Sequence, residues 1–467
     1  MLKFGTDGVR GVANSELTPE LALALGRAAV RVLGGERYAV GRDTRRSGPM
    51  LEAALAAGLA SEGADVTLLG VVPTPEVAWW SVTEGAPAAM VSASHNPFAD
   101  NGLKLFSAGG RKLSDAVEAQ LELELQRLLG AVVSSSETVV ASTDGERPGG
   151  RPDGQVAARP VPTGSGVGRI EAASGVHDGY AAAVVGSIEG RRLHGLTAVV
   201  DCANGSASVV APRVLRELGV DVEVLHAAPD GTNINDGCGS THPDDLARAV
   251  RDRGADLGIA FDGDADRVLL VDAAGELVDG DQIIAVCAID RHERGTLADD
   301  SVVVTVMTNL GFRLAMEERG IHVVETKVGD RYVLEALQEG GLSLGGEQSG
   351  HVIFPELATT GDGLLTAVQT LDVVVRTGRS LAELAAAMTR LPQVLRNVRV
   401  AERDPAIVDR LATDIAAVEK RLGPRGRVLV RPSGTEPLVR VMVEAPTAAE
   451  AESAVDELVR AVEALTA

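Results

Sequence analysis

Apolar and polar positions follow one recurring plan in three parts of the chain. Residues 38–70, 197–226 and 301–329 each begin with an apolar run rich in β-branched residues, continue through a polar loop and a helical segment, and end in a second such run. A glycine suited to the end of a helix precedes each second run. These glycines are Gly63, Gly219 and Gly320. The pattern predicts three strand–helix–strand units, each the start of an α/β domain.

The last part of the chain has a different pattern. NVRV, RVLVRPSG and LVRVMVEA have the composition of strands, and DPAIVDRLATDIAAVEKRL and TAAEAESAVDELVRAVEAL have the spacing of amphipathic helices. We therefore expect an α+β domain at residues 391–467. The three α/β domains before it are predicted at residues 1–172, 173–278 and 279–390.

One segment shows no sustained period. Residues 131–167 are rich in glycine, serine, proline and charge. Such composition is typical of an exposed, flexible loop or linker.

Length and composition indicate a multidomain globular protein. A chain of 467 residues exceeds the size at which one apolar core stops growing, so three or four domains are expected. No apolar run approaches the roughly 18 residues of a membrane span, and the N-terminal MLKFGTDGVRG lacks the apolar core of a signal peptide. The 3 cysteines are too scattered for a disulfide framework. We expect a cytoplasmic protein without a membrane partner.

Charge argues against a nucleic-acid partner. The formal net charge of -22 opposes binding to a polyanion, and an aromatic content of 2% leaves few stacking platforms. Any phosphate that the protein binds should therefore meet a local cationic pocket.

The first candidate for chemistry is the turn in VSASHNPFADNGLKLF, residues 91–106. Adjacent Ser94 and His95 do not form a nucleophile–base pair of the hydrolase type. One interpretation is an Asn-Pro turn capped by a serine hydroxyl. The other is a serine at a strand end that carries a phosphoryl group, because Lys104 on the next extended segment could reach back over it.

The second candidate is LGIAFDGDADRVLLV, residues 257–271, which places Asp262, Asp264 and Asp266 at alternate positions between two apolar runs. Crowded carboxylates repel one another unless a cation joins them. Oxygen ligands favour Mg²⁺ or Ca²⁺, but a Ca²⁺-binding EF-hand loop would be longer and end in a glutamate. The segment predicts a Mg²⁺ site, and the alternative is a solvated acidic turn.

Two further loops carry polar groups between glycines. GGEQSGH, residues 345–351, offers hydrogen bonds to vicinal hydroxyls, although such loops are also ordinary turns. RPSGTEP, residues 431–437, combines a guanidinium, two hydroxyls and a glycine N–H, which suits an anion; the alternative is a hairpin turn. Suppose that the phosphorylated serine donates its phosphoryl group to one end of a sugar phosphate while the distant site holds the phosphate at the other end. The bisphosphate then turns around and returns its other phosphoryl group to the serine. The combination predicts a mutase.

With these motifs the chain resembles the α-D-phosphohexomutase family, and within it the bacterial branch that acts on glucosamine phosphate. The resemblance runs over nearly the whole chain, through FGTDGVRGVAN, SASHNPFADNGLKLF, GTNINDGCGSTHP, FDGDADR, TKVGDRYV, GEQSGH and RPSGTEPLVRVMVE. It implies four domains in a heart shape around one cleft, three of them related α/β units. The segment around 133–160 departs from the family pattern because it is longer than the usual connection.

The resemblance also implies the roles of single residues. Ser94 would be the phosphorylated serine, and with Asp262, Asp264 and Asp266 it would bind one Mg²⁺. The implied sugar-binding residues are Glu347 and Ser349, and the implied phosphate-binding residues are Arg431, Ser433, Gly434 and Thr435. Arg10, Lys104 and His351 match positions near the transferring phosphoryl group, and His95 and Arg267 are expected to support them.

The implied reaction converts glucosamine 6-phosphate to glucosamine 1-phosphate through glucosamine 1,6-bisphosphate, for UDP-N-acetylglucosamine and cell-wall synthesis. Such an enzyme is an isomerase of the phosphotransferase type, a monomer or homodimer, and an activating kinase is a possible partner. One alternative is a phosphoglucomutase or phosphomannomutase, since Glu347 alone does not discriminate among sugars. The other is a non-catalytic sugar-phosphate or Ca²⁺-binding protein.

Overall fold

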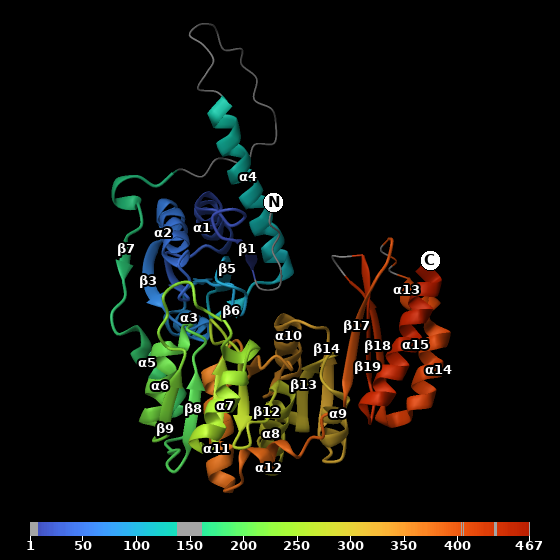
Figure 1. Ribbon diagram of the computed structural model, residues 1–467. Coiled ribbons are helices and arrows are strands. Elements are labelled where there is room, and N and C mark those ends of the chain that lie inside the picture. The colour runs from blue at the N-terminus through green and yellow to red at the C-terminus, as the bar shows by residue number, and fades with distance from the viewer. Residues whose placement is uncertain (1–7, 138–160, 403, 405, 434–436, 467) are drawn as a thin grey trace.

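The computed structural model describes residues 8–137, 161–402, 404, 406–433 and 437–466, except the side chains of 131–137. Four sheets follow one another along the chain (Figure 1). Each of the three predicted strand–helix–strand units is present, and in each of them the two strands lie parallel to each other. The predicted fold class is therefore confirmed.

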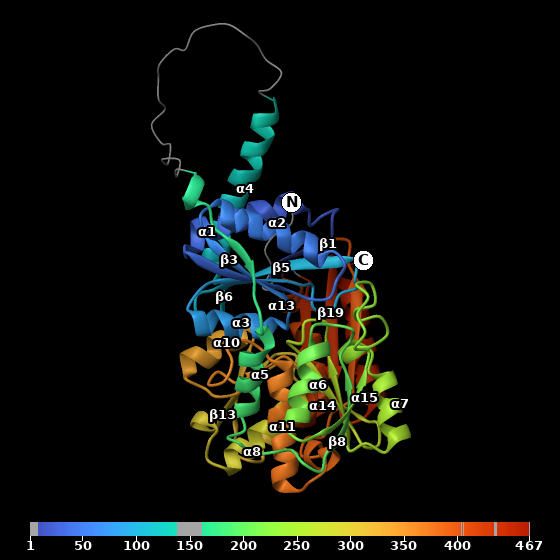
Figure 2. The same ribbon diagram turned by 90° about the vertical axis from the view of Figure 1, so that its left-hand side faces the viewer.

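The first sheet has seven strands in the order β1-β5-β4-β2-β3-β7, with β6 beside β5. The strands are β1 Val9–Val12, β2 Arg37–Arg42, β3 Asp65–Val71, β4 Ala88–Val91, β5 Asp100–Ser107, β6 Arg111–Lys112 and β7 Ile170–Ala172. The helices are α1 Pro19–Leu33, α2 Gly48–Ser61, α3 Thr74–Glu84 and α4 Asp115–Glu137. Helices α1 and α2 cover one face of the sheet and α3 covers the other (Figure 2).

The second sheet has five strands in the order β12-β11-β10-β8-β9. They are β8 Thr197–Asp201, β9 Asp221–Leu225, β10 Leu257–Phe261, β11 Val268–Asp272 and β12 Leu277–Val278. Its helices are α5 Val176–Gly186, α6 Ala207–Glu217 and α7 Asp244–Arg253. Strands β8, β9 and β10 are parallel, whereas β10 and β11 form an antiparallel hairpin.

The third sheet has the order β14-β13-β15-β16. Its strands are β13 Ser301–Thr305, β14 His322–Thr326, β15 Gly345–Gly346 and β16 Val352–Ile353. The helices are α8 Gly280–Glu293, α9 Leu310–Glu317, α10 Asp330–Gly340, α11 Gly363–Thr377 and α12 Leu381–Ala385. One continuous apolar core joins the second and third units, from Val210 on α6 to Phe312 on α9 and Leu371 on α11.

The last sheet is antiparallel in the order β17-β19-β18. Its strands are β17 Gln393–Arg399, β18 Arg427–Pro432 and β19 Leu438–Glu444, and its helices are α13 Ile407–Arg410, α14 Ala412–Leu422 and α15 Ala448–Thr466. This α+β unit has an apolar core of its own. It stands beside β14 and α9 (Figure 1), where Glu444 accepts hydrogen bonds from the side chain of Asn309 and the amide of Leu310, both at 3.1 Å.

The predicted loop at 131–167 differs in part from the structure. Helix α4 continues to Glu137, because extending an existing helix is easier than starting one. Residues 138–160 lie outside the described residues, and a short turn at Gly164–Gly166 leads into β7. The exact domain limits stay a prediction. Within the described part of the chain, every helix is too short or too polar to cross a membrane.

Candidate active site

Ser94 and the three aspartates lie on two turns that meet. The serine turn follows β4, and Ser94 is fully buried with a left-handed backbone, φ 54°. The aspartate turn joins β10 to β11. Ser94 Oγ donates a hydrogen bond to Asp262 Oδ2 at 2.6 Å. Two different sheets thus place the candidate nucleophile against the candidate metal ligands.

A buried network fixes the backbone of the serine turn. Ser92 Oγ accepts from the amide of Ser94 at 2.9 Å and donates to Asp43 at 2.6 Å. Asp43 forms an ion pair with Arg45, which donates to the carbonyls of Ser94 and Asn96, both at 2.8 Å. A non-glycine residue in the left-handed region is unfavourable by itself. Both ends of the Ser94 peptide unit are therefore held in place through Asp43.

Asn235 holds the same turn from the second domain. Its side-chain amide donates to the carbonyl of Ser94 at 2.9 Å and to that of Asn96 at 3.2 Å. Sequence reasoning missed Asn235 as well as Arg45. The signals available were the charged loop GRDTRRS after β2 and the polar GTNIND, both of which follow predicted strands of α/β units, where ligands tend to bind.

The three carboxylates are buried and differ in pKa. Burial and repulsion from Asp266 and Asp264 raise the pKa of Asp262 well above its ordinary value. Burial acts in the same direction on the other two, but the ammonium of Lys104, 2.8 Å from Asp264 and 3.4 Å from Asp266, outweighs it and lowers the pKa of both. The Thr74 hydroxyl also donates to Asp264 at 2.6 Å. One lysine thus offsets part of a threefold negative charge.

The aspartate turn fits a cation. One oxygen of each aspartate lies within 4.8 Å of one oxygen of each of the others. Asp264 Oδ1 and Asp266 Oδ1 are buried and have no hydrogen-bond partner among the described residues. Buried carboxylate oxygens without donors are costly, and a divalent cation with oxygen ligands would satisfy them.

His95 lies beside the Ser94 hydroxyl, and the positive charges of Arg267 and Arg10 act on His95. His95 Nδ1 is 3.3 Å from Ser94 Oγ and 3.3 Å from the Arg267 guanidinium. Burial lowers the pKa of His95, and the positive charges of Arg267 and Arg10 lower it further. Arg10 on β1 is paired with Gly102 on the neighbouring strand β5. A Cβ atom added at Gly102 would lie 3.1 Å from the Cγ atom of Arg10, so the Arg10 side chain lies over this glycine. His95 is therefore a neutral imidazole beside two cations.

His351 connects the aspartate turn to the third domain. Its Nδ1 lies 3.8 Å from Asp266 Oδ2, and its Nε2 lies 3.3 Å from Asp330 Oδ2. The amide of Gly361 donates to Nε2 at 3.1 Å. Burial lowers the pKa of His351, but the carboxylates of Asp266 and Asp330 outweigh burial and raise it overall. The ring is 2% exposed. This position favours orienting Asp266 over direct proton transfer to a sugar.

The loop with Glu347 and Ser349 packs against the aspartate hairpin. Gly350 accepts a hydrogen bond from the amide of Val268, two residues beyond Asp266, at 3.1 Å. Glu347 Oε1 accepts from the amide of Gly329 at 3.0 Å, which fixes its carboxylate. Ser349 Oγ is buried without a hydrogen-bond partner among the described side chains and backbone. The two predicted sugar-binding residues thus lie on a loop that contacts the metal turn.

The predicted phosphate site lies on the last sheet. Arg431 and Ser433 are at the end of β18, and Gly434 and Thr435 lie outside the described residues. Arg440 on β19 stands directly opposite Arg431. Burial lowers the pKa of Arg431, and the charge of Arg440 lowers it further. Two adjacent guanidinium groups suit an anion, and Arg440, which sequence reasoning missed, could have been noticed in the strand LVRVMVE.

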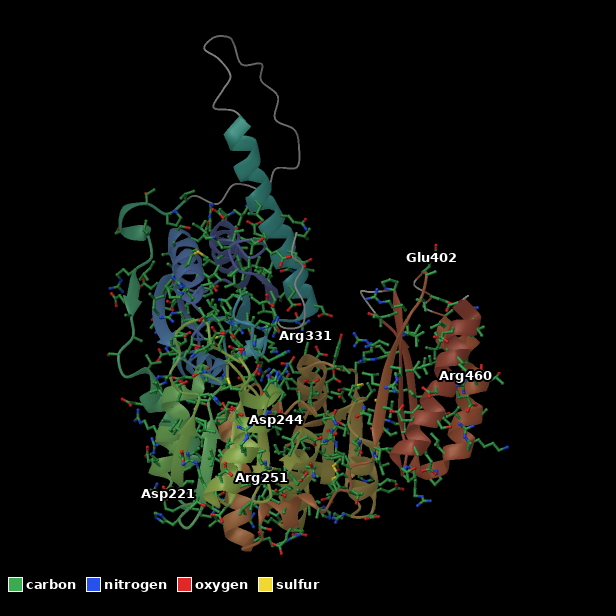
Figure 3. The ribbon with its side chains drawn as sticks, in the orientation of Figure 1. Asp221, Asp244, Arg251, Arg331, Glu402 and Arg460 are labelled. Carbon is green, nitrogen blue, oxygen red and sulfur yellow. The ribbon has the colours of Figure 1, made fainter. Side chains whose placement is uncertain are left out.

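Ion pairs also connect the first and third domains beside the site. Lys112 pairs with Asp330, the same carboxylate that faces His351. Arg331, labelled in Figure 3 below the first sheet, pairs with Asp115 and Glu118 at the start of α4. The domains that carry the serine turn and the Glu347 loop are thus joined directly.

Known proteins resemble the chain over its whole length. Models of the phosphoglucomutase/phosphomannomutase family match in four pieces, which are alpha/beta/alpha domain I at residues 1–129, domain II at 178–275, domain III at 279–391 and the C-terminal domain at 395–461. A phosphoglucosamine mutase from Frankia alni is 54% identical over 99% of this chain and 98% of its own length.

Solved structures share the fold. A phosphoglucomutase/phosphomannomutase family protein from Burkholderia thailandensis has a TM-score of 0.78 at 27% identity and covers 98% of this chain and 97% of its own. The Aspergillus fumigatus N-acetylphosphoglucosamine mutase, solved with GlcNAc-6P and magnesium, has a TM-score of 0.67 at 20% identity over 100% of this chain and 96% of its own, which supports the fold alone. The chain therefore belongs to the phosphoglucomutase/phosphomannomutase family of α-D-phosphohexomutases, beside the phosphoglucosamine mutases.

Proposed function

We propose that the chain is a phosphoglucosamine mutase that interconverts glucosamine 6-phosphate and glucosamine 1-phosphate through a phosphorylated Ser94. The observation that supports this most is the 2.6 Å hydrogen bond from Ser94 Oγ to Asp262, within a buried group of carboxylates and cations. The name of the Frankia relative supports the choice of glucosamine phosphate. Glucosamine 1,6-bisphosphate is the proposed intermediate and activator.

The transfer needs neutralisation of charge more than covalent chemistry. A Mg²⁺ ion bound by Asp262, Asp264 and Asp266 together with a phosphoserine oxygen would neutralise charge on the transferring group. Lys104, next to these carboxylates, adds a fixed positive charge. As the phosphoryl group leaves Ser94, the bond from phosphorus to the serine oxygen breaks and a new bond forms to the oxygen of a sugar hydroxyl. The proton of that hydroxyl ends on the serine oxygen.

The return step phosphorylates Ser94 again, so its hydroxyl must lose a proton. His95, neutral and 3.3 Å from Ser94 Oγ, is the proposed acceptor. Glu347 and Ser349 are the proposed partners of the sugar hydroxyls. Arg431, Ser433, Gly434 and Thr435 are proposed to hold the phosphate that is not transferred. The oligomeric state and an activating kinase stay predictions.

A coupled assay with Mg²⁺ and a trace of bisphosphate tests the proposal. Turnover of glucosamine 6-phosphate should exceed that of glucose and mannose 6-phosphates, a chelator should abolish it, and added Mg²⁺ should restore it. Ser94→Ala should be inactive but folded, whereas Ser61→Ala, on the outer end of α2, should behave as wild type. Faster turnover of glucose or mannose phosphate would show that glucosamine 6-phosphate is not the preferred substrate. Full activity of Ser94→Ala would refute the phosphoserine mechanism.

A further inference from the structure

A second group of metal-binding side chains lies in the second domain, apart from the aspartate turn. Asp201 ends β8, His226 follows β9, and Cys238 lies on the loop before α7. One ligand atom from each lies within 4.8 Å of the other two. Asp201 and Cys238 are fully buried. The carboxyl ends of parallel strands, where this group lies, are where α/β sheets tend to bind ligands.

The polar atoms of this group are arranged for a ligand. Asp201 accepts from the amides of Ala203 and Gly239, both at 2.8 Å, which fixes the carboxylate and leaves lone pairs on both oxygens. His226 Nδ1 is buried and lies 3.0 Å from Asp201 Oδ2, although the pair does not have the geometry of a hydrogen bond. The backbone of His226 is left-handed, φ 47°, which is uncommon for a residue other than glycine. The ring nitrogen therefore faces the Asp201 carboxylate inside the group.

We propose that Asp201, His226 and Cys238 bind one divalent transition-metal ion of the zinc class. Oxygen, imidazole nitrogen and thiolate sulfur together suit Zn²⁺, whereas Mg²⁺ takes oxygen ligands. Three protein ligands leave a fourth tetrahedral position for water. The His226 side chain is 28% exposed, which gives the ion a path from solvent.

Neighbouring residues support these ligands. His226 Nε2 faces Asp245 Oδ2 at 3.9 Å, and metal-binding histidines usually direct their second nitrogen to a carboxylate. The side-chain amide of Asn204 faces Cys238 Sγ at 3.9 Å, where it would stabilise a thiolate. Asp245 is in the first turn of α7, next to the Asp244 that Figure 3 labels.

Binding has a defined proton balance. A cysteine thiol carries its proton at neutral pH, because its ordinary pKa is about 8.5. When the ion binds, the S–H bond breaks, a sulfur–metal bond forms and one proton passes to solvent. The bound ion would join the ends of β8 and β9 to the loop that carries Asn235, and so would stabilise the support of the serine turn. The proposal does not depend on which sugar phosphate the enzyme uses.

Titration with Co²⁺ of the full-length chain, freed of metal by a chelator beforehand, tests the proposal. The titration is done in excess Mg²⁺, so that the aspartate turn is occupied, and in weak buffer with a pH indicator. We expect one Co²⁺ per chain with a sulfur-to-cobalt charge-transfer band, and release of one proton. Cys238→Ser should lose the band and the proton, whereas Cys287→Ser, at another buried cysteine, should keep both. Asp245→Ala, at a partly exposed position, should weaken binding about tenfold.

Each result decides for or against the site. A wild-type titration without a thiolate band, or a band that persists in Cys238→Ser, overturns the proposal. If Cys238→Ser does not fold, His226→Ala takes its place, and undiminished Co²⁺ affinity in that variant overturns the proposal as well. Protein purified without chelator should contain Zn²⁺, as measured by elemental analysis. Each Zn²⁺ ion that it carries should reduce its uptake of Co²⁺ by one ion relative to metal-free protein.

Discussion

Replacing Lys104 by methionine should destabilise the folded chain. The Lys104 ammonium lies 2.8 Å from Asp264 and 3.4 Å from Asp266, and all three side chains are almost completely buried. Methionine fills similar space but leaves both carboxylates without that positive charge. Breaking a buried ion pair costs about 3–5 kcal/mol, because the remaining charge stays desolvated. We expect a loss of this size in the free energy of unfolding at pH 7, with Mg²⁺ removed.

The loss should also depend on pH. Lys104 holds the folded-state pKa of Asp264 and Asp266 below 3.8, their ordinary value. A lowered folded-state pKa contributes stability that is present above the unfolded-state pKa and is lost as the pH falls through the folded-state pKa. The free energies of unfolding of wild type and variant should therefore approach each other below about pH 4.

Urea unfolding followed by tryptophan fluorescence measures this difference. The 2 tryptophans of the chain, Trp79 and Trp80, are on α3, whose first residue Thr74 donates a hydrogen bond to Asp264. The fluorescence therefore reports on the region beside the altered pair. Lys420→Met, at an exposed position on α14, is the matched control and should unfold as wild type does. Equal stability of Lys104→Met and wild type at pH 7, or a loss that stays the same well below pH 4, would refute the reasoning.

Three further substitutions test other parts of the structure. Asn235→Ala removes two hydrogen bonds of about 1 kcal/mol each from the serine turn. In steady-state kinetics kcat should therefore fall roughly 30-fold while KM stays unchanged. A change in KM alone would argue that Asn235 does not position the serine. Arg440→Met should raise KM for the hexose phosphate about tenfold or more, since a hydrogen bond to a charged group contributes about 1.5–3 kcal/mol, and an unchanged KM would exclude Arg440 from the phosphate site. Burial and the charge of Asp279 raise the pKa of Asp281 to about 7. The free energy of unfolding of the wild type should therefore fall as the pH rises from about 4 to 7. Asp281→Asn should remove that fall, as measured by melting temperatures at pH 5 and 8.

The sequence predicted those features that depend on neighbours in the chain. The aspartates lie within five residues, and two apolar runs on either side indicated the strands that hold them. The serine turn was recognisable for the same reason. In the structure the two turns touch through Ser94 and Asp262, 168 residues apart. Their proximity was expected from the chemistry that the motifs imply together and from the family resemblance, and no local pattern indicates it.

The supporting residues depend on tertiary contacts. Arg45 and Asn235 bind the carbonyl of Ser94 from 49 and 141 residues away, and no local period indicates such a contact. Arg440 is evident only once the register of β18 and β19 is known. The loop was predicted from residue 131 because the segment 131–167 as a whole is rich in glycine, serine and proline and has no sustained period. A helix that is already formed can nevertheless extend into the start of such a segment, as α4 does.

The continuous core of the second and third units has a mechanical consequence. Close-packed interiors cannot slide without opening voids, so the aspartate turn and the Glu347 loop move as one stiff body. The last unit has a separate core and meets that body through polar contacts at Glu444. Arg431 and Arg440 can therefore move toward or away from the aspartate turn while the distance between that turn and the Glu347 loop stays fixed. A bisphosphate that must turn around between two transfers could be released at one end without disturbing the groups that act on the other.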